Sequence, residues 1–423
     1  MITALKEPKL KKPLSELATQ LFAVFYIFHA YYSSIRGVRI GDIIMLISAA
    51  LFALLFNKKS FRFHEVYIAL SKLLCVFILI TLVDALIYKY VDMVGIAFRT
   101  IRWTFYIGVA CIVSECVDIN KLYRYLVAIG LISAIVIIVQ YLVYAIFKYP
   151  IGLNIGAEQY GYAVEKLRLD ETSYRKIYRF CAFYAEPSHF GYFESLVLAM
   201  IFFWHDKPNL KQIIVGVIII TGMLMSTSTY ALALLAVLVI AYLAQFIKKK
   251  YAEEKHDMRK VIAILAGILI LLVIAFLLVK DTAIVSYTLS KLGKIGSMSR
   301  TQYIWDNSKM DFPLAVKILG CGVGNEEYFV RQMFDTKLPY LNSLSIGFLY
   351  CGFTGLALMA WFFIRAIRVT GGRGRIILVL LLVMSLFSAA FYSSTVSLFL
   401  TAAVLGDRGF GEKNAAADAE ECI

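Results

Sequence analysis

The sequence predicts an all-α, polytopic integral membrane protein with 11–12 transmembrane helices and two large extracytoplasmic loops. Hydrophobic residues make up 61% of its 423 positions and charged residues only 17%, whereas soluble domains hold about 45–50% apolar and about 25% charged residues. Apolar runs of the ~20 residues that cross a bilayer recur along the chain. A soluble enzyme, a disordered chain and a nucleic-acid-binding domain are therefore excluded, despite a formal net charge of +14.

The apolar runs, taken in order, define ten spans and a longer final stretch. That stretch, residues 376–405, would be about 45 Å long as one helix, which is too long for a single crossing. Its polar segment Tyr392-Ser393-Ser394-Thr395 predicts a break into two short helices and hence twelve spans, whereas an unbroken helix would leave eleven. The ten preceding spans are expected at 17–35, 40–56, 66–88, 93–113, 121–147, 189–204, 210–226, 230–247, 261–279 and 341–364.

The positions of Lys and Arg predict that the N-terminus lies inside, because cytoplasmic loops are enriched in both residues. With this orientation 23 of the 43 basic residues fall in inner segments, and the short outer loops hold only Arg36, Arg39 and Lys89. Two long segments, 148–188 and 280–340, then lie outside. Long translocated loops tolerate basic residues, and long loops in a compact protein are usually functional.

The chain is accordingly expected to divide into six parts. Residues 281–296 place apolar side chains on one helical face, which suits a helix in the outer interface and equally a packed loop helix. No small-residue cleavage site follows the charged first residues, so no removable signal peptide is expected. The six parts are the N-terminal transmembrane helices (1–147), the first extracytoplasmic loop (148–188), the central transmembrane helices (189–279), the second extracytoplasmic loop (280–340), the C-terminal transmembrane helices (341–405) and a cytoplasmic tail (406–423).

Several ionisable residues fall inside the expected spans, in the outer half of the bilayer. Arg99 and Arg102 are three positions apart and share one helical face, while Asp84 and Glu194 lie near the outer ends of their spans. Charges at such depth are costly and mark functional sites by default. Two interpretations stay open: buried ion bridges, such as Asp84 with Arg99, or a cationic pocket for an anionic lipid headgroup, whose phosphate oxygens an Arg binds bidentately.

The first outer loop ends in Arg179-Phe-Cys-Ala-Phe-Tyr-Ala-Glu186-Pro-Ser-His189-Phe-Gly. Pro187 predicts the first turn of a helix, and Glu186 just before it is favourable at a helix N-terminus. A carboxylate and an imidazole three residues apart there can act as a general base or an orienting pair. The alternative is a helix cap with a packed histidine.

The second outer loop contains Arg300, Trp305 and the segment Leu319-Gly-Cys-Gly-Val-Gly-Asn325-Glu326, and Asn342 opens the span after it. Glycines allow tight turns and close backbone approach to a ligand. The segment is not a Walker loop, because no G-K-[ST] follows. No D-x-D pair occurs in the chain, so the usual metal clamp of nucleotide-sugar transferases is missing and no metal or cofactor is expected.

Together these motifs resemble those of the bacterial O-antigen and capsular polysaccharide repeat-unit polymerases (Wzy type), which are related to the O-antigen ligases. The likeness covers residues 179–365, and the N-terminal half matches only in its span pattern. No histidine lies between 280 and 340, where the ligases usually carry one. The motifs that carry the resemblance are R-x-x-x-F-x-x-E-P-S-H-F-G (179–191), S-T-S-T (226–229), R-x-x-x-x-W (300–305), G-x-G-x-G-N (320–325) and Gly352 with Gly355.

The resemblance implies a GT-C-like fold in the bacterial cytoplasmic (inner) membrane, with the active site on its periplasmic face. It implies transfer of a glycan from undecaprenyl diphosphate to the terminal sugar of a new lipid-linked repeat unit. Whether a chain-length regulator binds stays open, as do the alternatives of an O-antigen ligase and a lipid-linked oligosaccharide flippase. The implied site comprises Arg99, Arg102, Arg179 and Arg300 around the diphosphate, Glu186 as base with His189 as second choice, Tyr184 and Trp305 stacking on sugars, and Asn325 and Asn342 on the substrate.

Overall fold

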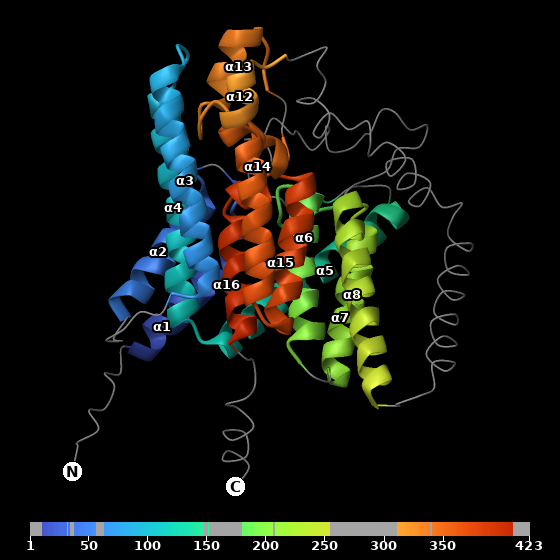
Figure 1. Cartoon of the computed structure of the whole chain (residues 1–423). Coiled ribbons are helices and arrows are strands. Elements are labelled where there is room, and N and C mark those ends of the chain that lie inside the picture. Colours follow the sequence, from blue (N-terminus) through green and yellow to red (C-terminus); the bar gives the residue numbers. More distant parts are fainter. Residues whose placement is uncertain are drawn as a thin grey trace, which may run out of the picture. The chain divides into compact units, whose positions relative to one another are not determined.

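The computed structural model describes residues 11–31, 33, 38–55, 63–147, 151, 180–205, 208–253, 311–338 and 341–408. All regular elements in these residues are helices (Figure 1). Five of the helices are long and apolar enough to cross a membrane: α3 (Glu65–Ile87), α4 (Met93–Cys116), α5 (Ile119–Phe147), the Thr229–Ile247 part of α8 (Thr229–Glu253) and α14 (Ser343–Val369). The coarse prediction of an all-helical chain with several helices long and apolar enough to cross a membrane is confirmed for the described residues.

The chain forms two compact units. Unit 1 comprises Met1–Ile129 with Ser297–Ile423, and unit 2 comprises Gly130–Gly296, so the boundary lies within α5. In unit 1, α4 packs on α2, α3 and α16, and α14 packs on α3 and α15. Its remaining elements are α1 (Lys11–Val24), α2 (Ile40–Leu55), α12 (Leu314–Leu319), α13 (Glu326–Phe334), α15 (Gly372–Phe387), the short 3-10 helix η4 (Ala390–Tyr392) and α16 (Thr395–Asp407).

Helix α14 is broken at Cys351 and Gly352, whose backbone dihedral angles are not helical. A Cβ built on Gly355 would lie 2.5 Å from the carbonyl oxygen of Gly347, although residues eight apart in a straight helix are about 12 Å apart. The two halves of α14 therefore fold back against each other, so the 27 residues that meet the length criterion do not form one straight crossing. The expected span 341–364 was wrong in being continuous, because Gly352 adopts a positive φ of 60° that favours glycine.

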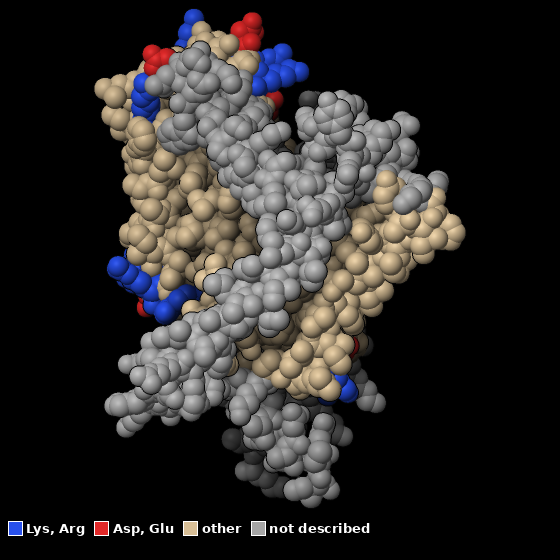
Figure 2. All heavy atoms as spheres, turned by 90° about the vertical axis from the view of Figure 1, so that its right-hand side faces the viewer, with Lys and Arg blue, Asp and Glu red and all other residues tan. Residues whose placement is uncertain are grey.

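The glycine-rich segment of the second loop pairs with the tip of this hairpin. The amides of Cys321 and Gly322 donate to the carbonyls of Leu349 and Tyr350 at 2.7 and 3.1 Å, which satisfies two groups that the break leaves without a helical partner. Helix α12 packs on α14, and α12 and α13 lie at one end of unit 1 (Figure 1). Figure 2 shows Lys, Arg, Asp and Glu side chains gathered at this end and at the opposite end, with uncharged surface between them.

Two other span predictions can be compared with the described helices, and one of them is confirmed. The stretch 376–405 does break beside Tyr392, between α15 and α16, as expected. The first span was placed too late, because α1 ends at Val24 and short turns follow it up to residue 30. The expected span 261–279 and the helix at 281–296 lie outside the described residues.

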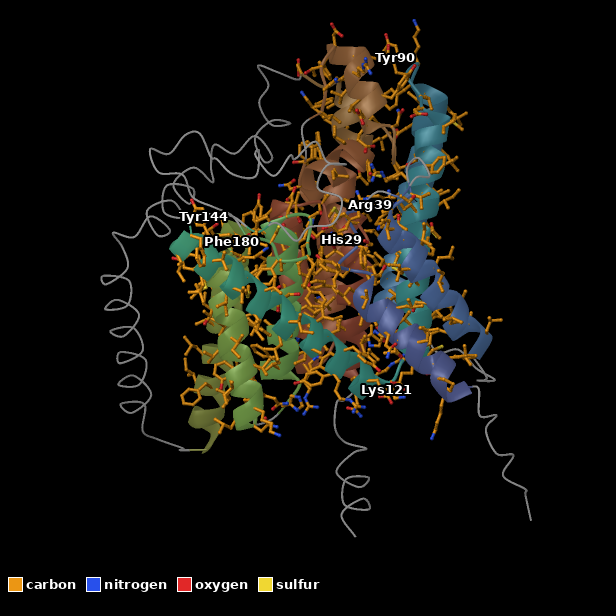
Figure 3. All side chains as sticks on the ribbon, turned by 180° about the vertical axis from the view of Figure 1, so that it is seen from behind. His29, Arg39, Tyr90, Lys121, Tyr144 and Phe180 are labelled. Carbon is orange, nitrogen blue, oxygen red and sulfur yellow. The ribbon has the colours of Figure 1, made fainter. Side chains whose placement is uncertain are left out.

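Unit 2 contains the second part of α5, α6 (Pro187–Phe203), α7 (Leu210–Met225) and α8, with α6 packed on both α7 and α8. Glycines set the closest approaches: a Cβ on Gly191 of α6 would meet Ala231 of α8, and one on Gly222 of α7 would meet Ala134 of α5. The segment before α6 is held by aromatic contacts, since the rings of Tyr144 and Phe180 lie 6.0 Å apart (Figure 3).

Candidate functional site

Arg102 is engaged by a carboxylate of its own unit. Its Nη2 donates to Oδ2 of Asp42 at 2.6 Å, and its Nε donates to the Tyr106 hydroxyl at 2.6 Å. The Tyr106 hydroxyl in turn donates to Oδ1 of Asp42 at 2.8 Å, which closes a ring of three side chains between α2 and α4. Side-chain exposure is 23% for Arg102 and 12% for Asp42. The guanidinium therefore already has the charged partner that a diphosphate would otherwise supply.

Arg99 has a weaker partner. Its Nη2 lies 3.6 Å from Oε1 of Glu326, in the first turn of α13, and the Arg99 side chain is 41% exposed. Burial raises the pKa of Glu326, and the positive charge of Arg99 opposes this rise. The bridge between Asp84 and Arg99, an example under one of the two open interpretations, does not form, and Arg99 pairs with Glu326 instead. Of the two span arginines, Arg99 is the one with exposed surface to offer a ligand.

The side chain of Asn325 is a structural clamp. Its amide nitrogen donates to the carbonyls of Tyr90 and Cys321, both at 2.9 Å, and its oxygen accepts from the amide of Asp92 at 2.7 Å. The residue is 1% exposed. These bonds tie the glycine-rich segment to the α3–α4 connection, where Tyr90 lies (Figure 3). The geometry gives Asn325 a folding role and leaves it little capacity for a substrate.

Asn342 is likewise used by the fold. Its oxygen accepts from the amide of Ser345 at 2.8 Å, which caps α14 as predicted, and its nitrogen donates to the carbonyl of Leu386 at 2.7 Å. The residue is 4% exposed. The capping bond and the bond to α15 together hold the start of the re-entrant half of α14.

Glu186 is the N-cap residue of α6, with Pro187 in the first turn, as the sequence predicted. Its side chain makes no capping hydrogen bond; instead Oε2 accepts from the Ser188 hydroxyl at 2.9 Å. Glu186 and His189 are both half-buried, and the His189 ring lies 6.3 Å from that of Tyr192. The Glu186 carboxylate thus keeps acceptor capacity at the end of a helix, as a general base needs.

Tyr184 does not present its ring to solvent. It is fully buried and packs against Phe190 and Phe193, with ring centroids 5.9 and 5.8 Å away. The ring therefore packs in the interior of unit 2 and does not offer the exposed face that the expected stacking on a sugar requires. Arg179, Arg300 and Trp305 lie outside the described residues.

Two buried carboxyl groups lack hydrogen-bond partners among the described residues. Within the described chain, neither oxygen of Asp84 nor of Glu194 has a hydrogen-bond partner, and the two residues are 1% and 0% exposed. In unit 2, Oε2 of Glu194 occupies the space beside Gly130, where a Cβ would lie 2.7 Å away. A partner-free charge at such a position is costly, so these groups are exceptional.

Sequence reasoning missed Asp42, Tyr106 and Glu326. Asp42 carried a usable signal, since it is an acid three residues into an expected span and such a residue usually has a partner. Glu326 follows directly on the glycine-rich segment, but its pairing with Arg99 depends on the folded chain. No protein-family model and no curated protein matches this chain.

Proposed function

We propose that the protein is a glycosyltransferase of the repeat-unit polymerase type in the bacterial cytoplasmic membrane. It transfers a glycan from undecaprenyl diphosphate to the terminal sugar of a lipid-linked repeat unit, without a metal. The sequence motifs at 179–191 and 320–325 support this proposal, together with helices apolar enough to hold a polyprenyl substrate in the bilayer.

The observation that carries the proposal is the state of Glu186. Glutamate is not one of the residues preferred for capping a helix, and the side chain of Glu186 makes no capping bond, so the start of α6 does not use its carboxylate. The carboxylate is instead half-buried, beside a helix start and hydrogen-bonded only to the Ser188 hydroxyl among the described residues. This arrangement suits a base that must accept a proton from a sugar hydroxyl.

In the proposed reaction the acceptor hydroxyl gives its proton to Glu186 while its oxygen attacks the anomeric carbon of the donor glycan. The bond from that carbon to the diphosphate oxygen breaks, and undecaprenyl diphosphate leaves with the electron pair. In unit 1, Arg99 has the exposed guanidinium surface that recognition of a lipid diphosphate requires. Arg102 positions α4 through Asp42 rather than binding the diphosphate.

A transporter of lipid-linked oligosaccharides is the second candidate. It is favoured by the partner-free carboxyls Asp84 and Glu194 and by the broken helix α14, because transporters place ionisable groups and interrupted helices at their substrate sites. The O-antigen ligase alternative has no comparable support among the described residues.

Incubation of the purified protein with synthetic undecaprenyl-diphosphate repeat units tests the proposal. A ladder of products, with and without EDTA, is the expected result, and lipid A core is left out so that a ligase could not produce it. Glu186→Gln should lower the polymerisation rate by roughly 10²–10⁴-fold, the usual contribution of a general base. Glu65→Gln, which changes an exposed carboxylate paired with Arg365, should leave the rate unchanged.

Two outcomes contradict the proposal. Wild-type rates from the Glu186→Gln protein would remove Glu186 as the base. Absence of any ladder, combined with movement of the same lipid across proteoliposome bilayers, would favour the transporter.

A further inference from the structure

Asp84 is a buried carboxyl group of unit 1 whose charge has no compensating hydrogen bond among the described residues. It lies in the last turn of α3 and is 1% exposed, and neither carboxylate oxygen meets a hydrogen-bond donor in the described chain. Its neighbour one turn earlier, Thr81, is by contrast fully used: its hydroxyl donates to the carbonyl of Phe77 at 2.7 Å and accepts from the amide of Val323 at 2.9 Å.

Three groups that interact electrostatically with Asp84 are a phenol and two thiols. Tyr88 follows it on the same face of α3, and the hydroxyl of Tyr88 is also buried without a partner among the described residues. The thiols of Cys321, in the glycine-rich segment, and of Cys351, at the tip of α14, lie within its electrostatic reach. The N-cap and first half of helix α4, which also packs on α3, contain three charged residues. Asp92 accepts from the amide of Gly95, Arg99 pairs with Glu326, and Arg102 pairs with Asp42.

An ionised carboxylate in such a place costs far more than a neutral acid. The charge of Asp42 in the same unit is, by contrast, compensated: Arg102 donates to one carboxylate oxygen at 2.6 Å and Tyr106 to the other at 2.8 Å. One turn before Asp84, the bond of Val323 to Thr81 joins α3 to the segment 320–325, and the bonds of Cys321 and Gly322 join that segment to the tip of α14. Broken helices next to membrane carboxyls are the places where membrane proteins bind protons and coupling ions.

We propose that Asp84 is a proton-binding site, held as a neutral carboxylic acid beneath the glycine-rich segment. Loss of the proton leaves a buried charge facing Tyr88, Cys321 and Cys351, and this charge weakens the contact of residues 320–325 with α3 and with the tip of α14. The site thereby links pH to the geometry of the second outer loop. The proposal stands independently of the proposed transferase activity.

Infrared spectroscopy of the purified full-length protein at neutral pH tests the protonation state directly. The wild-type spectrum should contain a carboxylic-acid carbonyl band that Asp84→Asn removes. Asp42→Asn is the matched control: Asp42 is ion-paired, so its substitution should remove carboxylate absorption and leave the acid band. Because Glu194 can contribute an acid band of its own, the result is the difference between wild type and Asp84→Asn. Asp84→Glu should shift the band rather than delete it, and it replaces Asp84→Asn if that variant does not fold.

Thermal unfolding supplies the second measurement. The melting temperature of the wild type should fall relative to that of Asp84→Asn as the pH is raised. Only the wild type loses folding free energy when a buried acid ionises. Both experiments are repeated in sodium, potassium and choline chloride. An identical acid band in wild type and Asp84→Asn overturns the proposal, and so does a band that appears only in choline, which would identify a metal-cation site instead.

Discussion

The Nη2 atom of Arg102 lies 2.6 Å from Oδ2 of Asp42, and this contact joins α4 to α2 across 60 residues of sequence. Breaking a buried ion pair by removing one partner is strongly destabilising, since the other charge is left without compensation. We therefore expect Asp42→Asn to lower the free energy of unfolding by about 3 kcal/mol. Thermal or denaturant unfolding in detergent measures this change.

The matched control is the ion pair of Arg365 with Glu65, whose side chains are 55% and 59% exposed. Exposed pairs contribute about 0–1 kcal/mol, so Glu65→Gln should scarcely change the unfolding midpoint. Equal losses in Asp42→Asn and Glu65→Gln would show that the Arg102–Asp42 pair does not stabilise unit 1.

The hydrogen bonds of Asn325 predict that a change of one side-chain atom strongly lowers the free energy of unfolding. Asn325→Asp keeps the shape but replaces the two donated bonds to Tyr90 and Cys321 with repulsion between oxygen atoms. The loss of two buried bonds should cost about 2–4 kcal/mol. Asn209→Ala, which removes the exposed capping box of α7, should cost only about 1 kcal/mol. Comparable unfolding midpoints for the two variants would contradict the clamp.

The break in α14 predicts that Gly352 does not tolerate a side chain. Gly352→Ala would place a Cβ against the backbone of Lys317 and Ile318, at a φ of 60° and a ψ of −151°. Such backbone conformations cost about 1–3 kcal/mol in a residue other than glycine, before any clash is counted. Gly108→Ala is the control, because a Cβ at that helical position meets nothing within 4 Å; it should stabilise by up to about 1 kcal/mol. The two unfolding midpoints should therefore move in opposite directions.

Glu326 predicts a pH dependence of stability. Its pKa is higher in the folded chain than in the unfolded chain because of burial, so the folded state binds the proton more tightly. The stability that this proton contributes is complete below the unfolded pKa of about 4.3 and is lost as the pH rises through the folded value. Glu326→Gln should remove this part of the pH dependence, and melting temperatures measured between pH 4 and pH 8 test it.

Substitution of Arg99 is a second test of the pH dependence that Glu326 predicts. The charge of Arg99 holds the pKa of Glu326 down, so Arg99→Gln should make stability fall more steeply with rising pH. A double variant with Glu326→Gln should lose that added steepness. If Arg99→Gln leaves the pH profile unchanged, the 3.6 Å contact has no energetic weight.

Features that depend on neighbouring residues could be predicted from the sequence. Pro187 after Glu186 placed the start of α6, Asn342 marked the cap of α14, and the polar segment at Tyr392 marked the break between α15 and α16. Each of these follows from backbone groups within one helical turn, which local side chains satisfy or interrupt. Glu186 is the candidate site residue that this local reasoning places best.

The sequence by itself determined an all-helical membrane chain and the ends of several of its helices, because composition and capping act locally. The tertiary structure decided which charges meet: Arg102 with Asp42, Arg99 with Glu326, and Asp84 with no described partner. It also showed that Asn325, which was expected to bind the substrate, hydrogen-bonds the backbone instead, and that α14 folds back at Gly352. In an apolar interior each buried polar group takes whatever partner packing brings within about 3 Å, and residue spacing along the chain does not contain that information.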